Sequence, residues 1–287
     1  LVESGSKFSI TDSHSTVWVN GNWTIAGEVN ITNSTIRMNG TGDGYSGINV
    51  TSSGWLIINE SSNITNGDVS AAEYFFIVQS GSNFSMDNSI LSECGWSSTE
   101  NERGLEIHTA VDSFKGNIID NNRAVIFFSD DNIIEDITAD NNYYAIFILG
   151  GDNNTLINIS TSNSGGNGLR INEDSDFNNI TGFESYEDAV GISMYQGNDN
   201  NTFSNILINK SDSIGIRIHG SWYNIFNNIT LINNDGLGIE FTNDADFNII
   251  QNSLISGTAD ASIYFNNGTN IPENNALYNN IFNNTVN

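Results

Sequence analysis

The chain has 287 residues, with 34 Asp and Glu against 8 Lys and Arg, which gives a formal net charge of −26. This charge excludes binding to nucleic acid or to an anionic membrane, since both need a basic protein surface. The 49 Asn, 54 Ser and Thr and 27 Gly disfavour helices, and a hydrophobic fraction of 38% is too high for a disordered chain. We therefore expect an all-β protein whose short strands are joined by Asn-rich turns.

The N-terminal third, residues 1–103, has the least regular pattern. Segments 17–25 and 47–50 alternate apolar and polar residues and are expected to be strands of irregular opening coils. The chain starts at Leu1 without an initiator Met or a charged leader, so we expect a mature or excised product. Cys94 is the single cysteine, so we expect a buried, unreactive thiol, with an intermolecular bridge as the alternative. No apolar run approaches the ~20 residues of a membrane span.

From residue 104 onward a first motif recurs: a small residue, an apolar residue, any residue and a second apolar residue. Its copies follow one another at intervals of 20 to 24 residues, which is typical of a solenoid repeat. The eight copies are 104–107, 124–127, 145–148, 168–171, 191–194, 215–218, 238–241 and 262–265.

A second motif runs in phase with the first. It begins with Asn, has an apolar residue two positions later, and ends two positions after that with Asn, Asp or Gly. The intervals are 22 to 24 residues until the last, which is 31 and includes an insertion around Pro272. Its copies begin at Asn132, Asn154, Asn178, Asn201, Asn224, Asn248 and Asn279.

The two motifs together predict one solenoid domain over 1–287, with regular coils of about 23 residues in 104–287. Each coil is expected to contain three short strands, because the segments alternate with period two over three or four residues. Stacked coils rise by ~4.8 Å, so residues at the tight bend should form a ladder of left-handed asparagines with amide-to-amide bonds. That row contains Asp136, Asn158, Gly182, Asn205, Asn228, Asn252 and Asn283.

These motifs resemble the parallel β-helix repeats of the pectin-lyase-like superfamily, and within it the NosD-type repeats of archaeal and bacterial surface proteins. The resemblance covers 104–287 clearly and 1–103 weakly. It implies a right-handed, single-stranded parallel β-helix and carries little information about activity.

Strict alternation in the first motif places Ile216, Ile218, Ile239 and Phe241 inside the coil and two rows of side chains on the outer face of the first sheet. In the superfamily that the chain resembles, this face binds polysaccharide in the lyases and hydrolases. The first row is Glu106, Ile126, Phe147, Arg170, Ser193, Arg217, Glu240 and Tyr264, and the second is His108, Phe128, Leu149, Asn172, Tyr195, His219, Thr242 and Asn266.

Five residues of these rows are candidates for polysaccharide lyase chemistry: Arg170, Tyr195, Arg217, His219 and Glu240. A lyase needs a cation beside the uronate and a Tyr, His or Lys that moves a proton. Sugar binding without chemistry, and plain surface packing through Arg–Glu pairs, are the alternatives. The diagnostic Asp-Pro-His, Asn-Thr-Asp and Arg-Ile-Lys clusters of the family's hydrolases and epimerases are absent from the sequence.

A row of aspartates lies two residues before the second motif. Like charges stacked at the coil rise repel one another, and a bound Ca²⁺ or Na⁺ would relieve this. The alternative is that each Asp closes its own Asx turn. The candidates for this cation site are Asp152, Asp176, Asp199 and Asp246.

Sixteen Asn-x-Ser/Thr sequons predict N-glycosylation and therefore an extracellular or cell-surface location. Half of them precede Asn88, so we expect a sugar-coated N-terminal part. The sites are Asn22, Asn30, Asn33, Asn39, Asn49, Asn59, Asn63, Asn83, Asn153, Asn158, Asn179, Asn200, Asn209, Asn228, Asn267 and Asn283.

The sequence favours an extracellular structural protein, a self-assembling sheath, surface-layer or filament subunit without a cofactor. Residues 279–287 stop mid-coil, and open strand edges around Ile281 and Val286 favour stacking onto another chain, although truncation of a longer protein would leave the same end. The alternatives are a polysaccharide lyase and a passive glycan-binding module that use the outer face of the first sheet.

Overall fold

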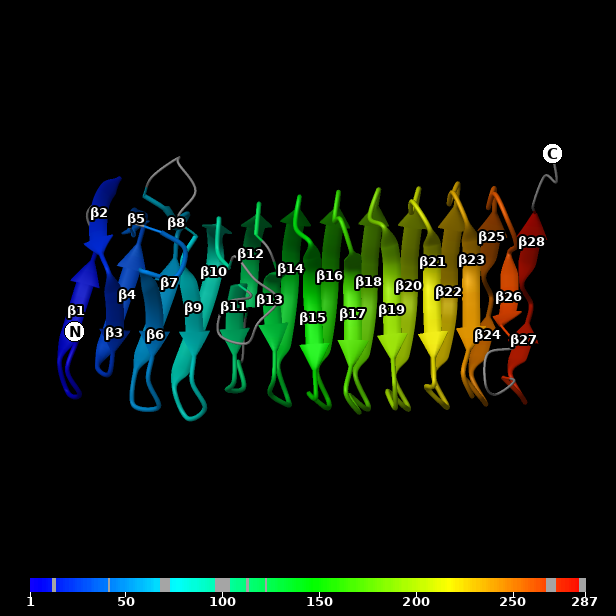
Figure 1. The fold of residues 1–287 in the computed structure, drawn as a ribbon. Helices are drawn as coiled ribbons and strands as arrows, with labels where there is room; N and C mark the ends of the chain where they lie inside the picture. The colour runs from blue at the N-terminus through cyan, green and yellow to red at the C-terminus, as the bar shows by residue number, and fades with distance from the viewer. Residues whose placement is uncertain are drawn as a thin grey trace. The chain divides into compact units, whose positions relative to one another are not determined.

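The computed structural model of the chain describes residues 1–11, 14–40, 42–67, 73–95, 104–111, 114–121, 123–266 and 272–283. Every regular element within these residues is a β-strand, and Figure 1 shows the strands labelled in chain order. They divide between two compact units, Leu1–Tyr143 and Tyr144–Asn287. The expected all-β class is confirmed, while a single domain over 1–287 stays a prediction.

The first unit is a stack of parallel strands in two sheets. Sheet A contains β3 (Asn22–Ile25), β6 (Gly47–Val50), β9 (Phe75–Val78), β11 (Gly104–Ile107) and β13 (Arg123–Phe127). Sheet B contains β1 (Lys7–Ile10), β2 (Ser15–Asn20), β4 (Glu28–Thr32), β5 (Ser34–Asn39), β7 (Trp55–Asn59), β8 (Asn63–Asn66), β10 (Asn83–Ser92), β12 (Phe114–Ile119) and β14 (Ile133–Asp140).

The second unit repeats this arrangement more regularly, with parallel strands in both sheets. Its sheet A contains β15 (Tyr144–Leu149), β17 (Asn167–Asn172), β19 (Val190–Tyr195), β21 (Ile214–His219), β23 (Leu237–Thr242) and β26 (Ile263–Asn266). Its sheet B contains β16 (Thr155–Ser162), β18 (Asn179–Tyr186), β20 (Thr202–Asn209), β22 (Ile225–Ile232), β24 (Ile249–Gln251), β25 (Leu254–Ser256), β27 (Ala276–Tyr278) and β28 (Ile281–Asn283).

The first sequence motif forms the strands of sheet A, as predicted. In the second unit Leu169, Ile192, Ile216 and Ile239 are partners in successive parallel strands without a register shift. The expected inward residues Ile216, Ile218, Ile239 and Phe241 are each 0% exposed. Fully buried Phe203 and Phe226 stack in the core with ring centroids 4.5 Å apart. Hydrophobic burial at identical positions of each coil therefore sets the register of the stack.

The three strands expected in each coil occur in a modified form. In the central coils of the second unit the second and third strands join into one eight-residue strand, such as β20 or β22. The bend within it is a left-handed residue, for example Asn205 at φ 56° or Asn228 at φ 57°. In the first unit β4 and β5 stay separate on either side of left-handed Asn33, whereas β10 and β14 are continuous strands with left-handed Asn88 and Asp136 inside them. Asparagine adopts this conformation at low cost, so it marks the bend in both units.

One member of the predicted bend row is wrong. Asn283 lies at the end of β28, paired with Ser256, whereas the left-handed residue in that coil is Asn279 at φ 51°. The Asn279 amide donates to Asn252 at 3.4 Å. The preceding Asn275 occupies the first position of the motif, because its Oδ1 accepts the backbone N–H of Asn248 at 2.8 Å. The last repeat therefore begins four residues earlier than the sequence spacing indicates.

A second ladder, which the sequence analysis did not predict, is buried at the first Asn of the same motif. The Oδ1 of Asn224 accepts the backbone N–H of Asn201 at 2.8 Å, and its Nδ2 donates to the carbonyl of Asn198 at 2.9 Å. The same Oδ1-to-backbone bond joins Asn154 to Asn178, Asn178 to Asn201, and Asn224 to Asn248. These side chains satisfy backbone groups at turns where no strand partner exists.

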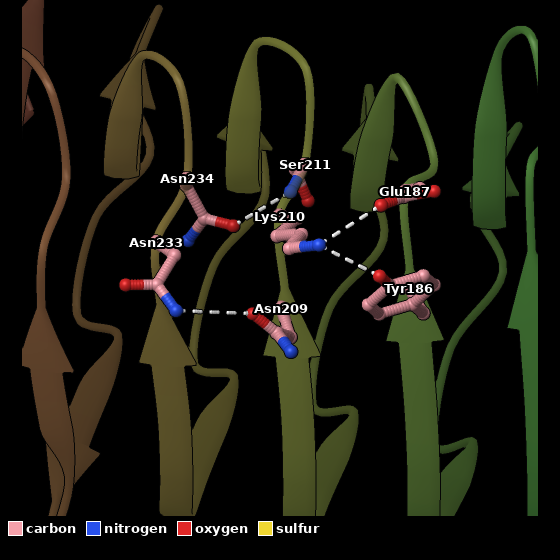
Figure 2. A network of polar contacts seen from close by, with 7 residues as sticks. All are labelled: Tyr186, Glu187, Asn209, Lys210, Ser211, Asn233 and Asn234. Carbon is pink, nitrogen blue, oxygen red and sulfur yellow. Dashed lines mark hydrogen bonds and ion pairs between the residues drawn. The ribbon is translucent and has the colours of Figure 1, made fainter.

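Figure 2 shows another turn of the second unit, with an exposed and a buried contact side by side. Asn234 Oδ1 accepts the backbone N–H of buried Ser211 at 2.9 Å. On the surface, the Lys210 ammonium donates to the Tyr186 hydroxyl at 2.7 Å and to Glu187 at 3.1 Å. Side-chain hydrogen bonds thus join successive coils at the turns as well as along the strands.

Cys94 is a free thiol with no exposed surface, in agreement with the expectation. Its Sγ lies 3.4 Å from the carbonyl of Tyr74, and burial raises the pKa of the Cys94 thiol well above its usual range. In the part of the chain that the structure describes, no helix is long and apolar enough to cross a membrane.

Candidate functional site

The candidate site is the outer face of sheet A in the second unit. Arg170 pairs with Ser193, Ser193 with Arg217 and Arg217 with Glu240, so the first predicted row is confirmed there. The second row is also in register, through Asn172, Tyr195, His219, Thr242 and Asn266. Because coils rise by ~4.8 Å, the two arginines lie about 10 Å apart along the stack.

Arg170 lies among aromatic rings. Its guanidinium carbon is 5.1 Å from the ring centre of Tyr144, 5.2 Å from Phe147 and 6.0 Å from Tyr195. Nη1 donates to the Tyr144 hydroxyl at 2.8 Å, while the buried Nε has no hydrogen-bond partner. Among the described residues no carboxylate lies within ion-pair distance of Arg170. The guanidinium is therefore held in place by rings and is left without a counter-charge.

Arg217 has a different environment. Its Nε donates to Glu240 Oε2 at 2.8 Å, and the side chains of this pair are 33% and 11% exposed. Asn266 Nδ2 donates to the other Glu240 oxygen at 3.3 Å. This is the cross-strand Arg–Glu pair that the packing alternative predicts, and it leaves the terminal nitrogens of Arg217 at the surface of the sheet.

His219 is stacked on Tyr195, with ring centroids 4.1 Å apart and planes at 5°. Asn243 Nδ2 lies 3.2 Å from His219 Nε2. Burial and the positive charge of Arg217 lower the pKa of His219 below its usual range, and Glu240 opposes this shift. The imidazole is consequently neutral at pH 7 and has a nitrogen able to accept a proton.

Several members of the predicted rows are buried and do not contribute to an open face, and Ser193, Glu240 and Thr242 are among them at 4%, 8% and 8% exposure. Glu106 and Ile126 are 0% exposed, and Phe147 and Leu149 are 3% and 8% exposed. Glu106 contacts His108, whose Nε2 is 3.7 Å from Oε2. Alternation determines the side of the sheet on which these residues lie, but other parts of the chain cover that side. Tyr144 is not among the residues predicted from the sequence, because it lies two residues before an apolar position and belongs to neither motif.

The aspartate row has a structural role that neither sequence interpretation described. Asp152 Oδ1 accepts the backbone N–H of Asp176, and Asp176 Oδ1 accepts that of Asp199, each at 2.7 Å. Asp199 and Asp246 accept the N–H groups of Trp222 and Glu273 in the same way. Each carboxylate thus caps the next coil. Burial raises the pKa values of Asp176 and Asp199, and neighbouring carboxylates raise them further.

Fifteen of the sixteen sequon asparagines lie in the described ranges, and none of these fifteen is buried. Asn267 lies outside the described residues, as does Val286 of the expected assembly seam. Glycosylation stays a prediction, and the exposure of these asparagine side chains is consistent with it.

A family model described as "Periplasmic copper-binding protein (NosD)" matches residues 125–287, more than half of the chain. The chain belongs to the NosD family. The resemblance inferred from the repeats is thereby confirmed, and the family description agrees with a location outside the cytoplasm. No protein of curated function matches this NosD-family chain.

The residues of this NosD-family chain do not fit a copper centre. The described residues contain no group of three or more His, Cys, Asp and Glu side chains placed to hold a metal ion. His108 and His219 are stacked face to face on Phe128 and Tyr195. The soft ligands that copper prefers are all in the core, at 0–1% exposure: Met38, Met86, Met194 and Cys94. Cation binding by the aspartate row stays a prediction.

Solved structures with the same fold include a mutant of the periplasmic alginate epimerase AlgG. It is 13% identical with a TM-score of 0.59, over 96% of this chain and 85% of the epimerase. A GH87 α-1,3-glucanase catalytic domain in complex with tetrasaccharides is 12% identical with a TM-score of 0.51, over 99% of this chain and 65% of the glucanase. At these identities the likeness shows the fold alone, and it agrees with a right-handed parallel β-helix.

Proposed function

We propose that the outer face of sheet A in the second unit binds a carboxylate-bearing polysaccharide at the cell surface. The observation that carries this proposal is Arg170, a guanidinium without a carboxylate partner among the described residues of a chain with net charge −26. In such an acidic protein an arginine without an ion-pair partner on the outer side of the sheet is suited to an anionic ligand.

The neighbouring groups support a sugar ligand. Arginine binds carboxylates through two parallel N–H donors, and the Nε of Arg170 has no hydrogen-bond partner. Tyr144 and Tyr195 offer ring surface for the C–H groups of a pyranose. A polymer with a carboxylate on every second sugar unit would meet Arg170 and Arg217 in turn. Two proteins with the same fold carry carbohydrate names: an alginate epimerase, and an α-1,3-glucanase in complex with tetrasaccharides.

The test is calorimetric titration of the whole chain with an oligogalacturonate and with its carboxyl-reduced counterpart. We expect only the acidic form to bind, and Arg170→Gln to weaken binding at least tenfold. Arg37→Gln is the matched control, because Arg37 also lies over an aromatic ring, 5.5 Å from the centre of Trp18, but in the first unit. Equal binding of the reduced glycan would contradict the proposal.

A lyase activity on the same face is the second candidate, favoured by the neutral state of His219. In a β-elimination, the base removes the proton next to the uronate carboxylate, a C=C bond forms, and the glycosidic oxygen leaves with the bond electrons. Arg217 would stabilise the carboxylate, and His219 or Tyr195 would accept the proton. Release of unsaturated sugar, lost in His219→Ala but retained in Arg37→Gln, would establish this activity, and its absence would leave binding without chemistry.

The structural role expected from the sequence also stays a proposal. Leu277, Ile281 and Phe282 of the last described strands are 40%, 63% and 46% exposed, so another coil, of this chain or of a second copy, would bury apolar surface there. Electron microscopy of native material distinguishes the roles, because fibres or lattices would indicate assembly and single particles would not.

A further inference from the structure

In the second unit, the turn from each sheet A strand to the next sheet B strand has a left-handed residue directly before the buried ladder asparagine. In three coils this residue is an asparagine, Asn153, Asn200 or Asn274, with φ between 54° and 56°. In three others it is an aromatic residue, Phe177, Tyr223 or Phe247, with φ between 54° and 57°. The row therefore contains, in irregular order, one residue type that tolerates the left-handed backbone conformation and one that does not.

The fold itself does not explain the aromatic residues. A left-handed conformation is unfavourable for bulky side chains and well tolerated by asparagine. Burial does not compensate for this, because Phe177, Tyr223 and Phe247 are 58%, 50% and 41% exposed, and the adjacent Trp222 is 43% exposed. Exposed apolar rings kept in an unfavourable backbone conformation, where asparagine would serve the fold better, indicate a binding surface.

The rings are held in a defined arrangement. Tyr223 and Phe247 are stacked with centroids 5.1 Å apart and planes at 14°. The Trp222 indole N–H donates to the carbonyl of Asp244 in the next coil. A ring surface fixed in this way loses little side-chain entropy when a ligand covers it. We call this row of rings, with the aspartates beside it, the aromatic edge.

The charge of the aromatic edge is of one sign. The described turn segments 150–154, 173–178, 196–201, 220–224 and 243–248 contain no Lys, Arg or His. Their seven carboxylates belong to Asp152, Glu173, Asp174, Asp176, Asp199, Asp244 and Asp246. Four of these aspartates cap the following coil, so the fold fixes their positions in spite of mutual repulsion.

We propose that the aromatic edge binds a cationic polysaccharide, a polymer of amino sugars with free ammonium groups. The C–H faces of the sugar rings would cover Phe177, Tyr223 and Phe247, and the ammonium groups would pair with the aspartates and the ring faces. A linear polymer fits because the carboxylates of Asp152, Asp176 and Asp199 follow one another at the coil rise of ~4.8 Å, about the length of a pyranose ring. This ligand differs in charge and location from the acidic glycan proposed for sheet A.

The experiment titrates the full chain with chitosan hexasaccharide, with its fully N-acetylated counterpart, and with hexalysine. We expect the chitosan to bind and the acetylated sugar to bind at least tenfold more weakly. Any binding of hexalysine should be unaffected by removal of the aromatic rings. The triple variant Phe177→Asn, Tyr223→Asn and Phe247→Asn should weaken chitosan binding at least tenfold. Its melting temperature should be unchanged or higher, since asparagine is the residue of the equivalent coils. Tyr45→Asn is the control, because Tyr45 is a 69% exposed aromatic residue of the first unit.

Three results would overturn the proposal. Equal binding of the acetylated sugar would show that charge is not recognised, and chitosan binding unchanged by the triple variant would show a general acidic surface. Hexalysine binding that the triple variant abolishes would show a basic peptide as the partner. Arg170→Gln separates the two proposals, because it should weaken oligogalacturonate binding at least tenfold and leave chitosan binding intact.

Discussion

The buried carboxylate of Asp188 accepts the backbone N–H of Ser164 at 2.8 Å, where other coils use an asparagine. Its second oxygen accepts the hydroxyls of Thr161 at 2.6 Å and Ser185 at 2.7 Å. At the equivalent place Asn234 Oδ1 accepts the N–H of Ser211. Burial raises the pKa of Asp188, and the hydrogen bonds it accepts oppose that rise.

Asp188→Asn should therefore retain the fold with unchanged or higher stability at pH 7, because the amide keeps the bond to Ser164 and removes a buried charge. Asp188→Ala should cost about 3 kcal/mol, since it removes the acceptor of the buried Ser164 N–H and of the Thr161 and Ser185 hydroxyls. Urea unfolding of both variants measures the difference. An equal loss of unfolding free energy in the two variants would show that Asp188 does not act as a member of the buried ladder that accepts backbone N–H groups.

The buried ladder should contribute more to stability than the exposed one. Asn224→Ala removes an acceptor for Asn201 and a donor to Asn198 inside the core, and we expect a loss of about 3 kcal/mol. Asn228→Gly at the exposed bend should cost under about 1 kcal/mol, because glycine accepts the left-handed conformation and already occupies this row at Gly182. Thermal melting compares the two, and similar losses would contradict the assignment of the buried row.

Ile216→Asp should destabilise the second unit by several kcal/mol, roughly 3–5, because it places an unpaired charge in the core. The control is Ile225→Asp, at a half-buried outward position of β22, which should cost about 1 kcal/mol. If Ile216→Asp melted like the control, the inward register of sheet A would be wrong.

Glu73 should make the stability of the first unit depend on pH. Burial, with smaller contributions from Asp43 and Glu93, raises its pKa from 4.5 to about 7. The native state thus holds a proton that the unfolded state has lost, so stability falls as pH rises from 4.5 to 7. The side chain is only half-buried, so we expect a loss of about 1–2 kcal/mol across this range.

Glu73→Gln should remove this dependence, so its melting temperature should exceed that of the wild type by an amount that grows between pH 5 and pH 8. Exposed Glu184→Gln is the control and should give a constant difference. A parallel pH response of Glu73→Gln and the wild type would exclude Glu73 as the group responsible.

Native material should carry glycans on several accessible sequons, above all those before Asn88. The intact mass should exceed that of the unmodified polypeptide, which is 31.3 kDa for these 287 residues, and enzymatic deglycosylation should remove the excess. A native mass equal to that of the bare chain would disprove this prediction.

The sequence by itself determined the solenoid, the register of sheet A and the inward direction of Ile216 and Phe241. The physical reason is that apolar residues two apart, repeated at each coil, must all be buried in one core, and a slip by one residue would expose every one of them. The same alternation aligned Arg170, Ser193 and Arg217 correctly. Short-range periodicity thus contains enough information for the strands and for the rows on their outer face.

The tertiary structure decided the features that depend on contacts between coils. Asn279, and not Asn283, continues the bend row. An insertion changes the spacing before the last repeat, so its first residue is identified only by the hydrogen bond from the Asn248 backbone N–H to Asn275. The burial of Glu106 and the contact of Tyr144 with Arg170 depend on residues that are distant in sequence, so no local sequence pattern predicts them. The aspartates cap the next coil for the same reason: their partners are 23 or more residues away in sequence and become neighbours only when the coils stack.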